Sequence, residues 1–348
     1  MNTLNKLIDW FLYSPIYNKD GAYLAYYSFK EKGPAYPEIT AYAISLSCIL
    51  YKRRKDEEFL ERAERCAEYL IKINKNGAIP CFSDNFLYAF DTGIFISSMF
   101  DLYALTHNKV YLNEAKKSVN WLYSLWNGRL FSAVDNVPEN KDWYHVPSVH
   151  LVKLIIPLIK ASTYLKDQKH EITALKLLGE YGQRQKEDGS FKISEGSDMI
   201  MTHPHCYATE AFLYAYHAFK REEFHEIAKK SSDWLCKVQN QDGSFYRYYN
   251  LEKIIEGKQN REKLKTSDAT AQATRIWKLL GVNKKGIEKA YKYLNTELKD
   301  NGLRLLKSTS FKEKLFSWRR PVYSWPTFFY LHSLLLTFGS IDQCKELF

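Results

Sequence analysis

The segment MTHPHCYATE, at residues 201–210, brings together side chains that could transfer protons. His203 and His205 flank a proline where a predicted helix begins, and Glu210 lies about a turn and a half inside that helix. Imidazole gains and loses a proton near neutral pH, and a carboxylate buried among apolar side chains is costly unless it is used or paired. We therefore predict that His203, His205 and Glu210 are catalytic. Two residues apart in an extended segment, the histidines would point in opposite directions.

Three further carboxylates lie where predicted helices open. Asp91, in FDTG, is predicted as the fourth catalytic residue, a general acid or base, although aspartate also suits the N-cap of a helix. Glu38, in YPEI, and Asp268, in TSDAT, lie in or before first helical turns, where acids also favour the helix dipole. We assign Glu38 and Asp268 to substrate binding, and the capping alternatives stay open.

Aromatic and basic residues gather in the long loops around these carboxylates. Aromatic faces pack on the apolar faces of sugar rings, and an arginine pair can hold a carboxylate or a phosphate, although loop arginines are also common on surfaces. The other residues predicted to bind substrate are Tyr36, Tyr88, Trp143, His145, Tyr207, Arg319, Arg320, Tyr323 and Trp325. The histidines match no known metal-ligand spacing, so we expect no metal and no cofactor.

These residues lie on a unit of roughly 50 to 60 residues that recurs along the chain. In each unit a long loop leads to an apolar helix, and after a tight turn a helix with one charged face returns. Six such hairpins predict an all-α fold, an (α/α)6 toroid with inner and outer helix rings, as one domain over residues 1–348. A linear solenoid of hairpins is the alternative. The inner helices are predicted to begin near Glu38, Asp91, Val146, His205, Ser267 and Ser324.

The order of loops and turns predicts where a site would lie. In the toroid the tight turns are at one end, and the long loops share the other end with the N-termini of the inner helices. Helix N-termini favour anionic or hydroxyl-rich ligands. We therefore expect the active site in a funnel between the long loops.

Composition narrows the function classes. No run of 18 or more apolar residues appears, so we expect no membrane span. The six cysteines are scattered without a CxxC pair, which predicts reduced thiols and a cytoplasmic protein. The net charge of +10 suits an anionic partner or solubility alone, and no motif indicates nucleic acid. The sequence leaves the oligomeric state open.

Several short motifs resemble those of known α/α toroids. The closures WLCKVQNQDGSF and YGQRQKEDGSF and the segment YAFDTGIF resemble terpenoid cyclases, protein prenyltransferases and six-hairpin glycosidases. AYPEITAY, FDTGIF and MTHPHCYATE occur in the order found in toroid proteins of bacterial exopolysaccharide-biosynthesis loci. This resemblance covers nearly the whole chain and implies a toroid fold. The chain departs from that pattern at Asp91, which replaces an amide, and at Glu210, where the pattern has no acid.

Three functions remain open. We favour a carbohydrate-active enzyme that acts on an acidic polysaccharide or oligosaccharide. It would use two-carboxylate hydrolysis, with Asp91 paired to Glu210 or Glu38, or lyase or epimerase chemistry with a tyrosine or histidine base. A terpenoid cyclase or prenyltransferase is the first alternative, although the sequence contains no DxDD and no aspartate-rich metal motif. A non-catalytic glycan-binding toroid is the second.

Overall fold

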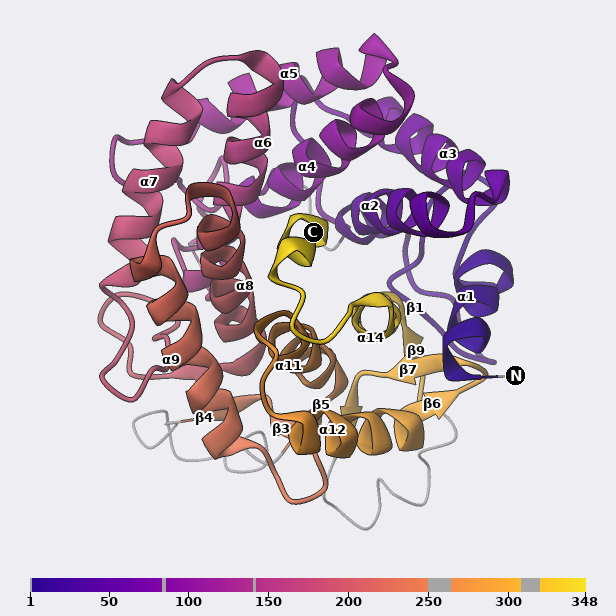
Figure 1. Ribbon diagram of the computed structural model, residues 1–348. Coiled ribbons are helices and arrows are strands. Elements are labelled where there is room, and N and C mark those ends of the chain that lie inside the picture. The colour runs from indigo at the N-terminus through magenta and orange to yellow at the C-terminus, as the bar shows by residue number, and fades with distance from the viewer. Residues whose placement is uncertain (1, 83–85, 140–141, 250–263, 308–319) are drawn as a thin grey trace. The chain divides into compact units, whose positions relative to one another are not determined.

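The computed structural model describes residues 2–82, 86–139, 142–249, 264–307 and 320–348 (Figure 1). The chain forms two compact units that interleave in sequence. Unit 1 comprises Met1–Ile16, Ala25–Gly33 and Arg184–Lys345, and unit 2 comprises Tyr17–Leu24, Pro34–Gln183 and Glu346–Phe348. No helix in these described ranges is both long and apolar enough to cross a membrane.

Unit 2 consists of three helix pairs. α2 (Pro37–Arg54) pairs with α3 (Glu57–Ile73), and α4 (Ala89–Thr106) pairs with α5 (Lys109–Ser124). The 3-10 helix η1 (Val149–Leu154) runs directly into α6 (Ile155–Leu165), which pairs with α7 (Lys169–Gly182). α4 also packs against both α2 and α6, so these three form the inner layer of the unit.

Burial separates inner from outer helices in this unit. α2 is buried without interruption from Pro37 to Leu50, and α4 from Ala89 to Phe100. α3 buries a single stripe that includes Phe59, Ala63, Cys66 and Leu70, and α5 does the same. An apolar helix has no polar face to turn toward water, so it takes the inner position, while a helix with one apolar stripe covers it from outside.

Unit 1 contains two further hairpins and one pair made from the two ends of the chain. α8 (Thr202–Phe219) pairs with α9 (Glu222–Val238), and α11 (Ser267–Leu280) with α12 (Lys284–Glu297). α14 (Ser324–Leu335) packs on α1 (Thr3–Tyr13), and the Phe328 ring lies 5.2 Å from that of Phe11. The sequence pattern predicts an amphipathic helix returning after each inner helix. In the described chain only the short η3 (Ile341–Glu346) follows α14, and the outer position is taken by α1.

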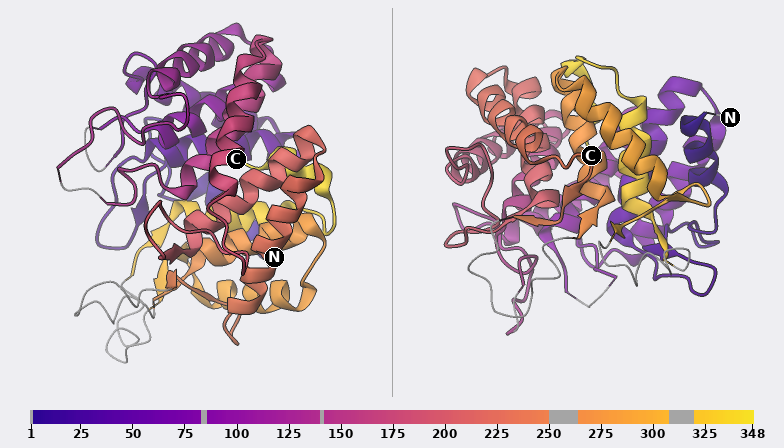
Figure 2. Two further views of the ribbon diagram at one scale, coloured as in Figure 1. Left: turned by 90° about the vertical axis from the view of Figure 1, so that its left-hand side faces the viewer. Right: turned by 90° about the horizontal axis from the view of Figure 1, so that it is seen from below.

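Short antiparallel strands precede the inner helices of unit 1 (Figure 2). β2 (Ile200–Met201), β5 (Lys265–Thr266) and β9 (Val322–Tyr323) end immediately before α8, α11 and α14. β2 pairs with β4 (Tyr248–Tyr249), and β5 lies between β3 (Phe245–Tyr246) and β8 (Leu306–Lys307). β9 lies between β1 (Tyr26–Tyr27) and β7 (Gly302–Arg304), which continues to β6 (Leu298–Lys299). The strands therefore fix where the first turn of each inner helix begins.

The observed inner helices begin close to the predicted positions. Two start at the predicted residue, and the fourth starts at Thr202, three residues before the predicted His205. Pro204 consequently lies inside the first turn of α8, where a helix does not need the missing backbone N–H. The observed starts are Pro37, Ala89, Val149 (as a 3-10 turn), Thr202, Ser267 and Ser324.

Two turns of sequence QxxDGSF in unit 1 repeat the same hydrogen bonds. In the first, Asp188 Oδ1 accepts bonds from the Ser190 amide (3.0 Å) and hydroxyl (2.6 Å), and the Gln185 amide donates to a carbonyl of α9 at 2.8 Å. In the second, Asp242 repeats the bonds to its serine, and Gln239 donates to a carbonyl of α12 at 2.9 Å. Each turn is thereby tied to the outer helix that follows it, which is a structural role.

The glycine of each turn is required by conformation and by space. Gly189 and Gly243 both have φ near +92°, in the left-handed region. A Cβ on Gly189 would lie 2.1 Å from a carbonyl oxygen of α9, and one on Gly243 would lie 2.2 Å from a carbonyl oxygen of α12. Gly128 has a similar φ of +95° but no atom within 4 Å of an added Cβ.

We expect Gly243→Ala to destabilise the protein much more than Gly128→Ala. The change at Gly128 should cost about 1 kcal/mol for the left-handed backbone, whereas the change at Gly243 should cost at least about 2 kcal/mol more because α12 must move. Urea unfolding followed by circular dichroism measures both. Equal losses in the free energy of unfolding would show that the close contact between this turn and α12 does not require glycine.

Candidate functional site

Two buried carboxylates lie in the first turns of neighbouring inner helices in unit 2. Glu38 is the second residue of α2 and is 4% exposed, and Asp91 is the third residue of α4 and is 0% exposed. The N-cap of α4 is Tyr88, so Asp91 is not a capping residue. Since α2 and α4 pack together, both carboxylates lie at the same end of the inner layer. Buried carboxylates require partners that offset the loss of water.

Each carboxylate receives a tyrosine hydroxyl. The Tyr36 hydroxyl donates to Glu38 Oε2 at 2.6 Å, and the Tyr144 hydroxyl donates to Asp91 Oδ1 at 2.5 Å. Desolvation, followed by the nearby charges of Glu38 and Asp91, raises the pKa of both phenols well above the usual value. The tyrosines therefore remain protonated donors, and the four residues form one cluster, which we call the carboxylate cluster.

Burial gives Glu38 the titration behaviour of a general acid. Desolvation raises its pKa from 4.5 to about 7, and the Tyr36 hydrogen bond, the Lys153 charge and a Tyr42 hydrogen bond oppose this rise. Lys153, in η1, is 1% exposed, and its ammonium lies 5.5 Å from the centroid of the Tyr42 ring. Glu38 can consequently hold or release a proton near neutral pH.

Aromatic rings surround the Asp91 side of the cluster. The His150 ring stacks on Tyr144 at 5.0 Å between centroids, and Trp143 lies edge-on to His150 at 5.1 Å. The Tyr88 ring lies 4.9 Å from Tyr144 and 5.8 Å from His145, whose Nδ1 is 2.8 Å from an Asp142 oxygen. The residues predicted in the first half of the sequence therefore meet in unit 2. They are Tyr36, Glu38, Tyr88, Asp91, Trp143 and His145.

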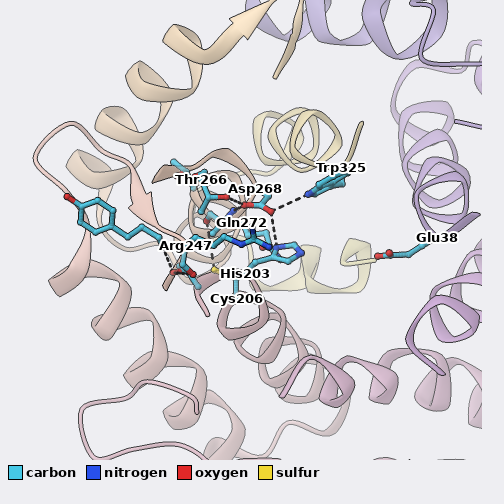
Figure 3. Close-up of polar contacts among 12 residues, drawn as sticks. Glu38, His203, Cys206, Arg247, Thr266, Asp268, Gln272 and Trp325 are labelled. Carbon is cyan, nitrogen blue, oxygen red and sulfur yellow. Dashed lines mark hydrogen bonds and ion pairs between the residues drawn. The ribbon is translucent and has the colours of Figure 1, made fainter. Parts of the chain in front are cut away.

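A second polar group, which we call the histidine cluster, lies in unit 1 at the starts of α8, α11 and α14 (Figure 3). His203 Nδ1 lies 2.6 Å from Gln272 Oε1 and 3.8 Å from Asp268 Oδ2, and the Trp325 indole donates to Asp268 Oδ2 at 3.2 Å. Figure 3 shows these four side chains pointing toward one another. The Tyr207 ring lies 4.4 Å from the His203 ring.

The amide and carboxylate oxygens fix the proton of His203. Both oxygens accept hydrogen bonds, so Nδ1 is assigned as the protonated nitrogen of the ring. His203 retains 19% of its side-chain exposure, and Asp268 retains 10%. Asp268 also accepts from the backbone N–H of Ala269 at 2.7 Å and from the Thr266 hydroxyl, so it is held in place as part of the α11 start.

His205 lies away from this cluster, in a buried network of its own. It is 0% exposed, its Nδ1 accepts the backbone N–H of Phe191 at 3.2 Å, and its Nε2 faces the Ser231 carbonyl at 3.3 Å. Burial lowers the pKa of His205 from 6.5 to about 3, so the ring is neutral. These contacts join the first QxxDGSF turn to α9 and give His205 a structural environment.

Glu210 is placed against a buried arginine. The Arg275 guanidinium, in α11, lies 3.3 Å from Glu210 Oε1, and both side chains are 0% exposed. The Arg275 guanidinium also lies 4.9 Å from the centre of the Phe329 ring. The predicted pair of Asp91 with Glu38 is therefore brought together in unit 2, whereas Glu210 shares an ion pair inside unit 1.

The predicted basic residues lie at the end of the chain. Arg320 donates to the Leu306 carbonyl at 2.7 Å, and Arg319 lies outside the described residues. The Tyr323 ring contacts the Trp325 ring at 4.9 Å. Within the described ranges no three His, Cys, Asp or Glu side chains gather as metal ligands.

Three buried polar residues near the carboxylate and histidine clusters were not among those predicted from the sequence. Lys153 and His150 are isolated polar residues in the apolar stretch VHLVKLIIPL, and Gln272 is an isolated amide in ATAQAT. Each is 1% exposed or less. A single polar residue in an otherwise buried helix is the signal that would have found them, because such a side chain needs a partner.

No protein-family model matches this sequence, and no curated protein matches it significantly. Solved structures do match. Cellobiose 2-epimerase from Bacillus thermoamylovorans gives a TM-score of 0.77 at 11% identity, over 96% of this chain and 99% of the other. An unsaturated glucuronyl hydrolase specific for heparin gives 0.70 at 14% identity, over 96% and 94%. An α-1,6-mannanase from Salegentibacter, in complex with α-1,6-mannotriose, gives 0.65 at 13% identity, over 99% and 98%.

These structures are α/α-toroid enzymes, and their likeness over nearly the full length confirms the predicted fold. The comparisons do not reach the toroid proteins of exopolysaccharide loci, so that resemblance stays a prediction. The chain has the (α/α)6 toroid fold.

Proposed function

We propose that this chain is a carbohydrate-active enzyme in which Glu38 and Asp91 act as an acid–base pair on a saccharide. The observation that carries the proposal is the carboxylate cluster, in which two buried carboxylates lie in the first turns of neighbouring inner helices and Glu38 has its pKa raised to about 7. Two carboxylates with different proton affinities are the usual requirement for glycoside hydrolysis. The carbohydrate-processing names of the similar structures support the same class.

In the proposed reaction Glu38 begins protonated and Asp91 ionised. Glu38 gives its proton to the glycosidic oxygen as the bond to the anomeric carbon breaks. A water molecule attacks that carbon, either directly with Asp91 as its base or after Asp91 has formed a covalent intermediate. Tyr36 and Tyr144 hold the carboxylates in place by donating to them. Lys153 lowers the proton affinity of Glu38, which keeps it near the working pH.

An acidic saccharide is the substrate class we propose, and the whole chain is proposed to act as one domain. The excess of basic residues favours an anionic ligand. The rings around Asp91 offer flat faces for sugar packing. A buried cluster of tyrosines and carboxylates does not suit an isoprenoid, which requires an apolar chamber, so we rank terpenoid chemistry below carbohydrate chemistry.

A lyase or epimerase is the second candidate, favoured by the histidine cluster. With its Nδ1 bound to Gln272, His203 would be the base that removes a proton from a sugar carbon next to a carboxylate or carbonyl. Tyr207 beside it offers a second hydroxyl. A glycan-binding protein without catalysis would contain the same surfaces but show no turnover of any saccharide.

Glu38→Gln and Asp91→Asn should each lower hydrolysis by roughly 100-fold or more, because each removes one half of the acid–base pair. The assay is reducing-end release from a panel of neutral and acidic oligosaccharides. Glu57→Gln is the matched control, since Glu57 also lies in a first helical turn and also accepts a tyrosine hydroxyl, but on an exposed outer helix. Normal rates in both cluster variants would exclude the two-carboxylate mechanism. A loss in His203→Gln alone would favour the second candidate.

Activity should fall as the pH rises through about 7, because Glu38 then loses the proton it must donate. The same group makes stability depend on pH. Its pKa is higher in the folded than in the unfolded chain, so its contribution to the free energy of unfolding is full below pH 4.5 and is lost by about pH 7. Between pH 4.5 and 8, the thermal midpoint should fall less with rising pH in Glu38→Gln than in the natural protein. Parallel declines would contradict a raised Glu38 pKa.

A further inference from the structure

A pocket of about 310 Å³ in unit 1 is lined by residues of β7, β8 and β9 and by residues next to these strands. Its walls include Arg304, Leu305, Leu306, Arg320, Pro321 and Tyr323. This volume is at the lower end of small-molecule sites, which suits a single sugar ring. Neither polar cluster includes any of these side chains.

Among the described residues, the pocket lining includes two guanidinium groups and no carboxylate. Arg304 donates to the Thr296 carbonyl at 2.8 Å and lies 3.3 Å from a Glu297 oxygen. Arg320 donates to the Leu306 carbonyl at 2.7 Å. These contacts fix both planar groups before a ligand arrives. A guanidinium held in place in this way suits a carboxylate, which it can bind through two parallel hydrogen bonds.

Apolar and aromatic groups form the remainder of the wall. Leu305, Leu306 and Pro321 can contact the C–H face of a sugar ring, and the Tyr323 ring lies beside them. Tyr323 contacts Trp325, whose indole donates to Asp268 in the histidine cluster. Tyr323, Trp325 and Asp268 therefore connect the pocket to His203, all within unit 1.

We infer that this pocket is a binding site for a sugar carboxylate, with Arg304 and Arg320 holding the carboxylate and Tyr323 packing on the ring. This pocket lies in unit 1 and would bind the sugar carboxylate, whereas the carboxylate cluster lies in unit 2. This inference deepens the acidic-sugar part of the proposed function but does not depend on hydrolysis. Binding to the pocket and turnover at Glu38 can therefore fail separately.

Calorimetric titration of the full chain with D-glucuronate, D-glucose and acetate tests the inference. Glucuronate should bind saturably and more tightly than the other two, since only glucuronate offers both a carboxylate and a ring. Arg320→Gln should weaken glucuronate binding by roughly 10-fold or more, because a charge-assisted hydrogen-bond pair is lost. Arg129→Gln, an exposed arginine paired with Glu180, is the control and should bind as the natural protein does.

Arg304 requires a paired change, because removing it alone would leave the buried Glu297 carboxylate without its arginine. The double variant Arg304→Gln/Glu297→Gln should fold, with its thermal midpoint as the check, and should also bind glucuronate weakly. Glucuronate binding no tighter than glucose or acetate, or unchanged binding in Arg320→Gln, would overturn the inference. Loss of turnover in Glu38→Gln bears only on the proposed function and does not test the pocket.

Discussion

The burial of the inner helices is the constraint on which the other features depend. α2 and α4 have no face left for water over most of their length, so every charged side chain on them must find a partner inside the protein. Lys160, Asp101, Ser97 and Ser45 show the result in unit 2, where ammonium, carboxylate and hydroxyl groups join at 2.6–2.8 Å. This network lies near the middle of α2, α4 and α6, about two turns from the helix starts. At the helix starts, the same need for buried partners brings tyrosine hydroxyls to Glu38 and Asp91.

Two buried carboxylates, Glu210 and Glu38, have different kinds of partner. Glu210 faces an arginine, and both side chains are fully buried, so the arginine offsets the charge of the carboxylate. Burial raises the pKa of Glu38 to about 7, and the tyrosine hydroxyls that donate to it oppose this rise only in part. Because both carboxylates are buried, they differ in their partners rather than in their burial.

The outer layer contributes a different constraint. The QxxDGSF turns place a glycine against a carbonyl of the following outer helix, and a glutamine from the same turn binds that helix. His205 belongs to this system, since it accepts the amide of Phe191, the last residue of the first turn. The turn motif and the second histidine of MTHPHCYATE therefore serve packing. His203, on the opposite side of the same helical turn, faces Gln272 and Asp268.

The sequence alone determined the helix types and most of their starts, because an apolar helix and a helix with one apolar stripe differ in residue pattern at short range. It also placed Glu38, Asp91 and Asp268 at helix openings. Only the tertiary structure decided their partners. Tyr144 meets Asp91 across 53 residues and Gln272 meets His203 across 69, and such contacts depend on which helices become neighbours. The same applies to α1, which pairs with α14 from the opposite end of the chain. Periodicity within a helix contains no information about these pairings, since they arise from packing between helices.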